Sequence, residues 1–302
     1  MASLQAKLIL KALSLRPFGW AKGSLEDQRA WMEKMTRALK ISADIILSRL
    51  DADGVPAELI DVENSGNGVI LYLHGGAYAV GSVKGHREYL ARLARTCRYK
   101  VLAIDYRLAP EHPFPAALED AITAYRWLVS GGYDPSSIAI AGDSAGGGLA
   151  IATLASLRDE GYPLPPCAVC LSPWVNLATA NETLDQHHDP ILNAEILAHF
   201  AHAYAGQIDT HYPLISPIFA DLKGLPPMLI HAGTNEILRD QITQFYEKAR
   251  LAGVEVELEL WEDLFHVFQM VPILPETKQS LKRVAEFITR KFSESDNPAA
   301  AI

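Results

Sequence analysis

Short, uninterrupted apolar runs alternate with helix-length segments from about residue 44 to the end of the chain. Such runs are typical of parallel strands covered on both faces, because neither face then needs polar side chains. The segments between them have helical periodicity, and several end at a glycine that suits a left-handed C-cap. This alternation predicts an α/β fold with a mostly parallel sheet and right-handed crossovers. The runs are Lys100–Ile104, Ile138–Ala141, Ala168–Leu171, Met228–Ala232 and Val254–Leu260, the helices lie near 86–97, 116–130, 145–158, 236–252 and 276–291, and the glycines are Gly131, Gly161 and Gly253.

The first strands are expected to differ from the rest. Ile45–Leu50 and Pro56–Asp61 read as two antiparallel strands around the turn at Asp53-Gly54, and Gly68–Leu73 reads as a third strand. The sheet should therefore begin with a hairpin and continue with parallel strands.

Two segments do not follow the alternation. Residues 1–43 are helical by pattern, and residues 178–215 lie between two predicted strands, with Asn193 placed as the N-cap of a helix. Both can pack as a cap over the carboxyl edge of the sheet, where ligands bind in open α/β sheets. The alternative is that they complete the core on a sheet face. With a cap, the chain divides into N-terminal cap helices (1–43), an α/β domain (44–177 and 216–302) and a cap insertion (178–215).

The composition limits the partners of the chain. Its 302 residues, 49% hydrophobic and 21% charged, suit one large α/β domain. A net charge of −9 makes nucleic acid and anionic membranes unfavourable partners, because like charges repel. Lys7 and Lys11 interrupt the apolar N-terminal run, which we interpret as an amphipathic helix rather than a targeting signal. No stretch reaches the apolar length of a membrane span, so we expect no stable membrane insertion and a cytoplasmic location.

The cysteines indicate neither a disulfide scaffold nor a metal site. There are three of them, Cys97, Cys167 and Cys170, and the last two form a C-x-x-C inside an apolar run. A redox pair would lie at a helix N-terminus, and a zinc site would need two more ligands. We expect buried thiols in a strand and no bound metal.

Gly142–Gly146 has the pattern G-x-S-x-G, with Ser144 at its centre. A predicted strand leads directly into it and a small-residue helix leads out. A nucleophile on so tight a strand-to-helix turn needs flanking glycines, because side chains there would clash with neighbouring elements. The turn also puts the serine at a helix N-terminus, where the dipole favours a developing anion.

A serine hydroxyl is a weak nucleophile until a base accepts its proton. When a serine lies on a turn of this kind, the acid and the histidine follow it in that order, and only His266 lies late in the chain, after the last strand. The acid should follow the strand Met228–Ala232, where Glu236 and Asp240 are candidates. Glu236, at the end of the loop, reaches an imidazole more easily, and Asp240 is the alternative.

Backbone amides must face the oxygen of a tetrahedral intermediate. Ala145, immediately after the serine, should supply one N–H group. The loop after the third strand, which contains Gly75, Gly76 and Ala77, should supply the other, because glycines let the backbone approach closely.

Together these motifs resemble the bacterial hormone-sensitive-lipase-like (family IV) carboxylesterases of the α/β-hydrolase superfamily. The resemblance spans essentially the whole chain and implies an eight-stranded sheet, a helical cap, ester hydrolysis and no cofactor. Two positions depart from the family pattern, since Ala77 replaces a glycine and Glu236 replaces an aspartate. The matching motifs are His74–Tyr78, Asp105–Pro115, Gly142–Gly147, Ser172–Val175 and Gly233…Glu236…Asp240.

The expected substrates are neutral esters of modest size. The residues expected to form the pocket wall are apolar or aromatic and include no cluster of basic side chains; they are Tyr78, Trp174, Phe18 and Trp20. A lactonase or an amidase could use the same triad, because only the pocket shape separates them. A ligand receptor like the plant gibberellin receptor is a third reading, but that receptor lacks the histidine that this chain has as His266.

Two further expectations concern the backbone and the assembly. Prolines crowd between a strand and a helix at residues 111–115, so we expect a cis bond between Phe114 and Pro115. The strand at 254–261 should lie at the edge of the sheet, where its glutamates either keep the edge monomeric or need neutralising by Lys248 or Arg250. The family resemblance favours a two-fold homodimer that pairs this strand with its copy.

Overall fold

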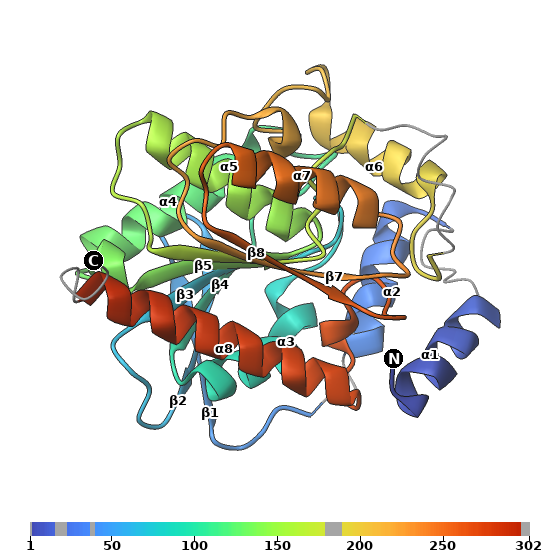
Figure 1. Cartoon of the computed structure of the whole chain (residues 1–302), viewed down its shortest axis with the longest axis horizontal. Coiled ribbons are helices and arrows are strands. Elements are labelled where there is room, and N and C mark those ends of the chain that lie inside the picture. Colours follow the sequence, from blue (N-terminus) through green and yellow to red (C-terminus); the bar gives the residue numbers. More distant parts are fainter. Residues whose placement is uncertain (1, 16–22, 37–39, 179–188, 297–302) are drawn as a thin grey trace.

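The computed structural model describes residues 2–15, 23–36, 40–178 and 189–296 (Figure 1). In these residues eight strands form one sheet in the order β1-β2-β4-β3-β5-β6-β7-β8. β2 is antiparallel to both of its neighbours, and every other pair is parallel, so the predicted fold class is confirmed. The strands are β1 Ile45–Asp51, β2 Pro56–Val62, β3 Val69–Leu73, β4 Lys100–Ile104, β5 Ile138–Asp143, β6 Cys167–Leu171, β7 Met228–Gly233 and β8 Val256–Trp261, and the helices are α1 Leu4–Leu15, α2 Leu25–Thr36, α3 Val83–Cys97, α4 Ala116–Ser130, α5 Ala145–Asp159, α6 Ala194–Ala205, α7 Arg239–Leu251 and α8 Pro275–Asp296.

Helices cover both faces of the sheet. α3 and α8 lie on one face, and α4, α5 and α7 lie on the other (Figure 1). Within β3, Leu71 and Leu73 belong to the core on the α4–α5 side, whereas Ile70 and Tyr72 face α3 and α8. Every residue of β3, β5, β6 and β7 is buried, which explains why these strands read as uninterrupted apolar runs.

The guanidinium group of Arg29 ties α2 to the loops after β3 and β4, and Glu33 of the same helix pairs with Lys84 of α3. Nε of Arg29 donates to the Ala79 carbonyl at 2.8 Å, and Nη2 donates to the Ala109 carbonyl at 3.1 Å. The same side chain forms an ion pair of 2.7 Å with Glu111. An arginine holds two carbonyls and a carboxylate at once because its planar head carries several donors in a fixed arrangement.

α1 packs on the C-terminal part of the chain. Ala6 is fully buried in an apolar cluster with Phe265 and Phe268. The N–H and hydroxyl groups of Ser3 both donate to the Glu276 carboxylate, at 2.6 and 3.0 Å. Both N-terminal helices are therefore attached to the α/β core.

β8 lies at the edge of the sheet, as predicted, but its glutamates have other partners than expected. Lys248 and Arg250 belong to α7, on the opposite face of the sheet, where Lys248 donates to two carbonyls and Arg250 pairs with Glu247. α8 runs along the face that the glutamates occupy and supplies the cations. The pairs are Glu255 with Lys291 at 2.8 Å, Glu257 with Arg290 at 2.5 Å and Glu259 with Arg283 at 2.7 Å.

The backbone agrees with most local predictions and corrects one. Gly161 and Gly253 have positive φ after their helices, but Gly131 has φ −76° and the left-handed residue is Gly132. That helix ends with its C-cap in an ordinary conformation, and the chain turns one residue later. The Phe114–Pro115 bond is cis, as predicted, and Ala109–Pro110 is cis as well. Asn193 caps α6 through its side chain, as expected.

Candidate active site

Ser144 lies on the sharp turn between β5 and α5. Its backbone has φ 52° and ψ −120°, a combination that residues with a side chain rarely adopt. The turn brings the start of α5 so close to β3 that a Cβ at position 146 would collide with the carbonyl of Leu73. Glycine at that position therefore permits the geometry that presents the Ser144 hydroxyl to a cavity.

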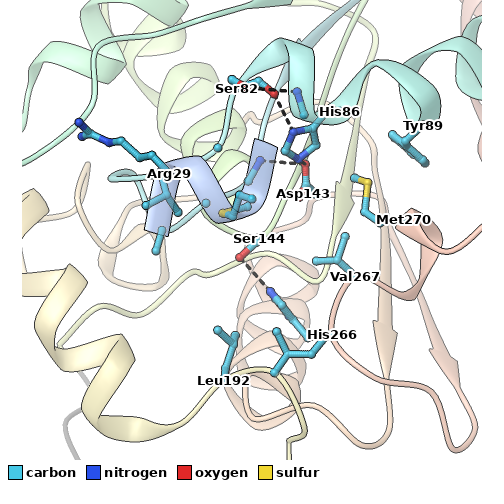
Figure 2. A pocket seen from close by; sticks show the side chains of 18 of the residues that line it. Arg29, Ser82, His86, Tyr89, Asp143, Ser144, Leu192, His266, Val267 and Met270 are labelled. Carbon is cyan, nitrogen blue, oxygen red and sulfur yellow. Dashed lines mark hydrogen bonds and ion pairs between the residues drawn. The ribbon is translucent and has the colours of Figure 1, made fainter. Parts of the chain in front are cut away.

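His266 faces this serine from the loop after β8. Its Nε2 atom is 2.9 Å from Oγ of Ser144 (Figure 2). Burial lowers the pKa of His266 below its usual value of 6.5, although the charges of Asp189 and Asp143 oppose this shift. The histidine is therefore neutral at neutral pH, which is the form that can accept a proton from a hydroxyl group.

Glu236 lies behind His266 and is completely buried. Its Oε2 atom is 4.0 Å from Nδ1 of His266 and accepts hydrogen bonds from Ser172 Oγ at 2.7 Å and from the Gly233 N–H at 3.0 Å. Burial raises the pKa of Glu236 to about 8, and these two hydrogen bonds oppose the rise. Asp240, the alternative acid, lies in the first turn of α7, where its side chain is 45% exposed and pairs with Arg239.

Ser172, noted above only as part of a motif, and Asp189, which was not singled out in the sequence, hold this acid loop. Ser172 donates to Glu236 and accepts from the N–H of Val267, so one hydroxyl joins the acid to the loop of His266. Asp189 accepts from the N–H groups of Ile237 and Ile191. These contacts join segments far apart in the sequence, and a serine after a strand or an aspartate before a proline carries no sequence signal of such a role.

The loop after β3 supplies amides near the serine, with one correction to the expected set. The N–H of Gly75 donates to Oδ1 of Asp143 at 2.9 Å, so it is already used. Within the described residues no acceptor is found for the N–H groups of Gly76 and Ala77. Ala145 is the first residue of α5, so its N–H has no acceptor within the helix. Gly76, Ala77 and Ala145 are therefore the amides free to donate.

A cavity of about 430 Å³ opens at Ser144 and extends towards the first turns of α3. Trp31 and Met32 of α2 form one side of it, and Leu192 and Leu197 lie on the side of α6. Its walls are mainly apolar. In the described part of the chain, no group of three or more His, Cys, Asp or Glu side chains is arranged to hold a metal ion.

The four residues expected to line the pocket have different positions. Trp174 contributes to the cavity wall. Tyr78 does not, because its ring is buried behind the wall and stacks on Tyr204 with 3.7 Å between ring centroids. Phe18 and Trp20 lie outside the described residues. The sequence predicted a cap from residues 1–43, but it did not predict which residues of α2 line the cavity.

Comparisons with known proteins place this fold in a known family. A family model for an alpha/beta hydrolase fold matches residues 70–270. A crystal structure of an esterase from the bacterial hormone-sensitive lipase family is 42% identical with a TM-score of 0.92, and the match covers 97% of this chain and all of the other. An acetyl-hydrolase of Streptomyces hygroscopicus is 43% identical over 74% of this chain and 76% of its own length. An esterase of Acinetobacter venetianus is 36% identical over 86% of this chain and 88% of its own length.

No helix in the described residues has the length and apolar character needed to cross a membrane.

Proposed function

The chain belongs to the bacterial hormone-sensitive-lipase family of α/β-hydrolase-fold esterases, and on that premise we propose that it hydrolyses neutral short-to-medium acyl esters through Ser144, His266 and Glu236. The observation that carries the proposal is the distance of 2.9 Å between His266 Nε2 and Ser144 Oγ. Both side chains line the same cavity.

In the first half of the reaction, His266 accepts the proton of Ser144 as Oγ forms a bond with the ester carbonyl carbon. The carbonyl oxygen becomes an anion, which receives hydrogen bonds from the free amides of Gly76, Ala77 and Ala145. Collapse of this intermediate breaks the bond to the alcohol oxygen. The alcohol leaves with the proton from His266, and the acyl group stays on Ser144.

In the second half, water replaces the alcohol. His266 accepts a proton from water while the water oxygen bonds to the acyl carbon, and the second tetrahedral anion forms at the same amides. The bond to Ser144 Oγ then breaks, and Oγ recovers its proton from His266. The carboxylic acid departs, and no cofactor is consumed. Glu236 stabilises the imidazolium in both halves.

The size and lining of the cavity support the proposed substrate class. A volume of about 430 Å³ with largely apolar walls fits a small neutral ester better than a charged one, because a buried charge would need partners. Phe18 and Trp20 remain proposed contributors to this pocket.

We also keep a cytoplasmic location as part of the proposal, to be tested by cell fractionation.

We propose that the segments 1–43 and 178–215 act as a cap on the α/β domain formed by 44–177 and 216–302. The position of α2 and of Leu192 and Leu197 around one cavity supports this division.

The homodimer through residues 254–261 also remains a proposal. Its support is the position of β8 at the sheet edge, together with the pairing of its glutamates with α8, which reduces the repulsion between two copies.

One experiment tests the reaction directly. Purified protein is treated with a fluorophosphonate, the labelled peptide is identified, and p-nitrophenyl esters from acetate to laurate are assayed beside a lactone and an anilide. We expect the label on Ser144 and the highest kcat/KM on the shorter acyl esters. Labelling of Ser144 with hydrolysis of the lactone or the anilide alone would contradict the ester assignment.

A further inference from the structure

His86, in the first turn of α3, is a buried histidine on the wall of the catalytic cavity, and its ring nitrogens face two acceptors. Nδ1 lies 2.9 Å from the carbonyl oxygen of Ser82, and Nε2 lies 3.4 Å from Oδ1 of Asp143 (Figure 2). The residue is 7% exposed. A carbonyl oxygen and a carboxylate oxygen only accept hydrogen bonds, so both nitrogens must carry a proton to use these partners. The geometry therefore favours the imidazolium form.

Asp143 is the residue before Ser144, and every contact of its Oδ1 atom is with a donor. Oδ1 accepts from the hydroxyl of Tyr72 at 2.7 Å and from the N–H of Gly75 at 2.9 Å, and it faces His86. A Cβ at position 75 would occupy the place of this carboxylate, so the glycine there leaves room for Asp143. Asp143 thus holds the start of the loop whose next two residues, Gly76 and Ala77, line the cavity together with Ser144.

The charge on Asp143 raises a difficulty that His86 resolves. In the proposed reaction a negative charge develops on an oxygen bound by the amides of Gly76, Ala77 and Ala145, close to this buried carboxylate. Two negative charges near one another at low effective dielectric repel strongly. A cation beside Asp143 removes that repulsion while the carboxylate continues to hold Gly75.

We propose that His86 is a positioning residue that stays protonated in the working enzyme, neutralises Asp143 and so keeps the oxyanion loop in place without opposing the oxyanion. This inference rests on the proposed ester hydrolysis and names a residue that tunes it. His86 itself forms no bond with substrate in this scheme; it acts through Asp143 and Gly75.

The groups around His86 agree with this charge state. Burial alone would lower its pKa, but the charge and hydrogen bond of Asp143, the Ser82 carbonyl and the charge of Asp105 outweigh burial and raise it. His74, 5.5 Å away between ring centroids, has its pKa lowered to about 4 by burial and by the charge of His86, so it is neutral and does not compete. The phenol ring of Tyr72 lies 6.4 Å from the His86 ring between centroids, and Tyr89 packs in turn against Tyr72.

The charge state can be measured without any substrate. Nitrogen-15 NMR of the histidine side chains, with His86 assigned by comparison with His86→Gln, should show both nitrogens protonated at neutral pH. A spectrum in which one nitrogen of His86 lacks a proton would overturn the inference, whatever the enzyme hydrolyses. Ester assays that fail while this spectrum is as expected would instead count against the proposed function.

The kinetic test uses a double-mutant cycle of His86→Gln and Asp143→Asn. His86→Gln leaves the carboxylate without its cation, so kcat should fall about 10- to 100-fold with KM within about twofold. Adding Asp143→Asn removes the unmatched charge but keeps an oxygen that can accept from the N–H of Gly75. The double variant should therefore recover at least about half of the decrease in log kcat caused by His86→Gln. A double variant no faster than His86→Gln would show that only packing matters, and it would overturn the proposal.

His231→Gln is the matched control. His231 is also a buried histidine beside a carboxylate, with Nε2 3.2 Å from Glu259 Oε2, but it lies outside the cavity and contacts Ser280. Its loss should lower the melting temperature and leave kcat within about twofold. An equal fall of kcat in His231→Gln and His86→Gln would mean that general loss of stability explains both.

Discussion

The hydroxyl of Ser172 donates a 2.7 Å hydrogen bond to Oε2 of Glu236, the same carboxylate oxygen that is 4.0 Å from Nδ1 of His266. Oε1 of Glu236 and Nδ1 of His266 have no hydrogen-bond partner among the described residues. Oε2, the oxygen that faces the histidine, is thus held in place by other donors, and Nδ1 of His266 still lacks an acceptor among the described residues. A small shift of the ring on substrate binding would join them, since catalytic hydrogen bonds are often long in free enzymes.

The acid can be identified by comparing Glu236→Ala with Asp240→Ala. Glu236→Ala should lower kcat by about 10⁴-fold, because the imidazolium loses its counter-charge, and Asp240→Ala should cost less than about tenfold. Glu236→Asp should restore part of the loss. The measurement is kcat on one p-nitrophenyl ester, with circular dichroism as a control for folding. A larger loss in a folded Asp240→Ala would make Asp240 the acid.

Ser144 and His266 should behave as one unit. Ser144→Ala and His266→Ala should each lower kcat by about 10⁶-fold, and the double variant should be no worse, because either change alone removes the same nucleophile. Single-turnover assays on the four proteins measure this. Additive losses in the double variant would indicate that the two residues act in separate steps.

Activity should increase with pH. Burial raises the pKa of Glu236 to about 8 and lowers the pKa of His266. As the pH rises, the pair therefore loses its last proton at a pH close to the pKa of Glu236. The competent state has an ionised Glu236 and a neutral His266, so kcat/KM should rise through neutral pH and level off above about 8. In Glu236→Gln the rise should move below pH 6.5, where only His266 titrates. A flat profile between about pH 5 and 9 would contradict this assignment.

Removal of residues 1–40 should change substrate preference and stability together. α2 supplies Trp31 and Met32 to the cavity wall, and α1 buries Ala6 against the core. The melting temperature should fall by several degrees, and the preference among acyl chains should broaden because one wall is missing. Leu8→Ala, on the exposed face of α1, is the control that should change neither. An unaltered acyl-chain profile in the truncated protein would remove the cap from the proposal.

Light scattering at micromolar concentration tests the dimer. We expect twice the 33.1 kDa of one chain, and Leu258→Pro should yield monomers because proline cannot donate to a pairing strand. Leu260→Lys is a milder second variant, since this leucine on β8 is 47% exposed. Leu251→Lys, on an exposed side chain of α7, is the control. A 33.1 kDa species of the unaltered chain would refute the dimer, as would a dimer insensitive to both β8 variants.

Local patterns were sufficient to predict the sheet and the turn that carries Ser144. α4 begins and ends where its periodicity predicts, and β5 leads into the turn at Ser144. The structure also brings His266 and Glu236 to that serine, because strand order in a parallel sheet decides which loops meet at one edge. Such inferences need only the order of elements along the chain.

Contacts between distant faces could not be predicted in this way. Tyr78 directly follows Ala77 in the loop after β3, yet its ring turns into the core and stacks on Tyr204. The glutamates of β8 find cations on α8 because of the side of the sheet on which each helix packs. Asp143 and His86 meet for the same reason. Side-chain direction at a crossing of elements depends on packing, which the sequence does not display.

The attachment of α2 through Arg29 has a consequence for how this enzyme can diversify. The helix lines the cavity with Trp31 and Met32, contributes none of the three residues proposed for the reaction, and is tied to the α/β domain through Arg29 and Glu33. In the proposed scheme, part of the cavity wall is thus encoded apart from the three residues that carry out the chemistry. Substitutions confined to residues 25–36 can therefore change the substrate range during evolution while the residues proposed for the reaction stay the same.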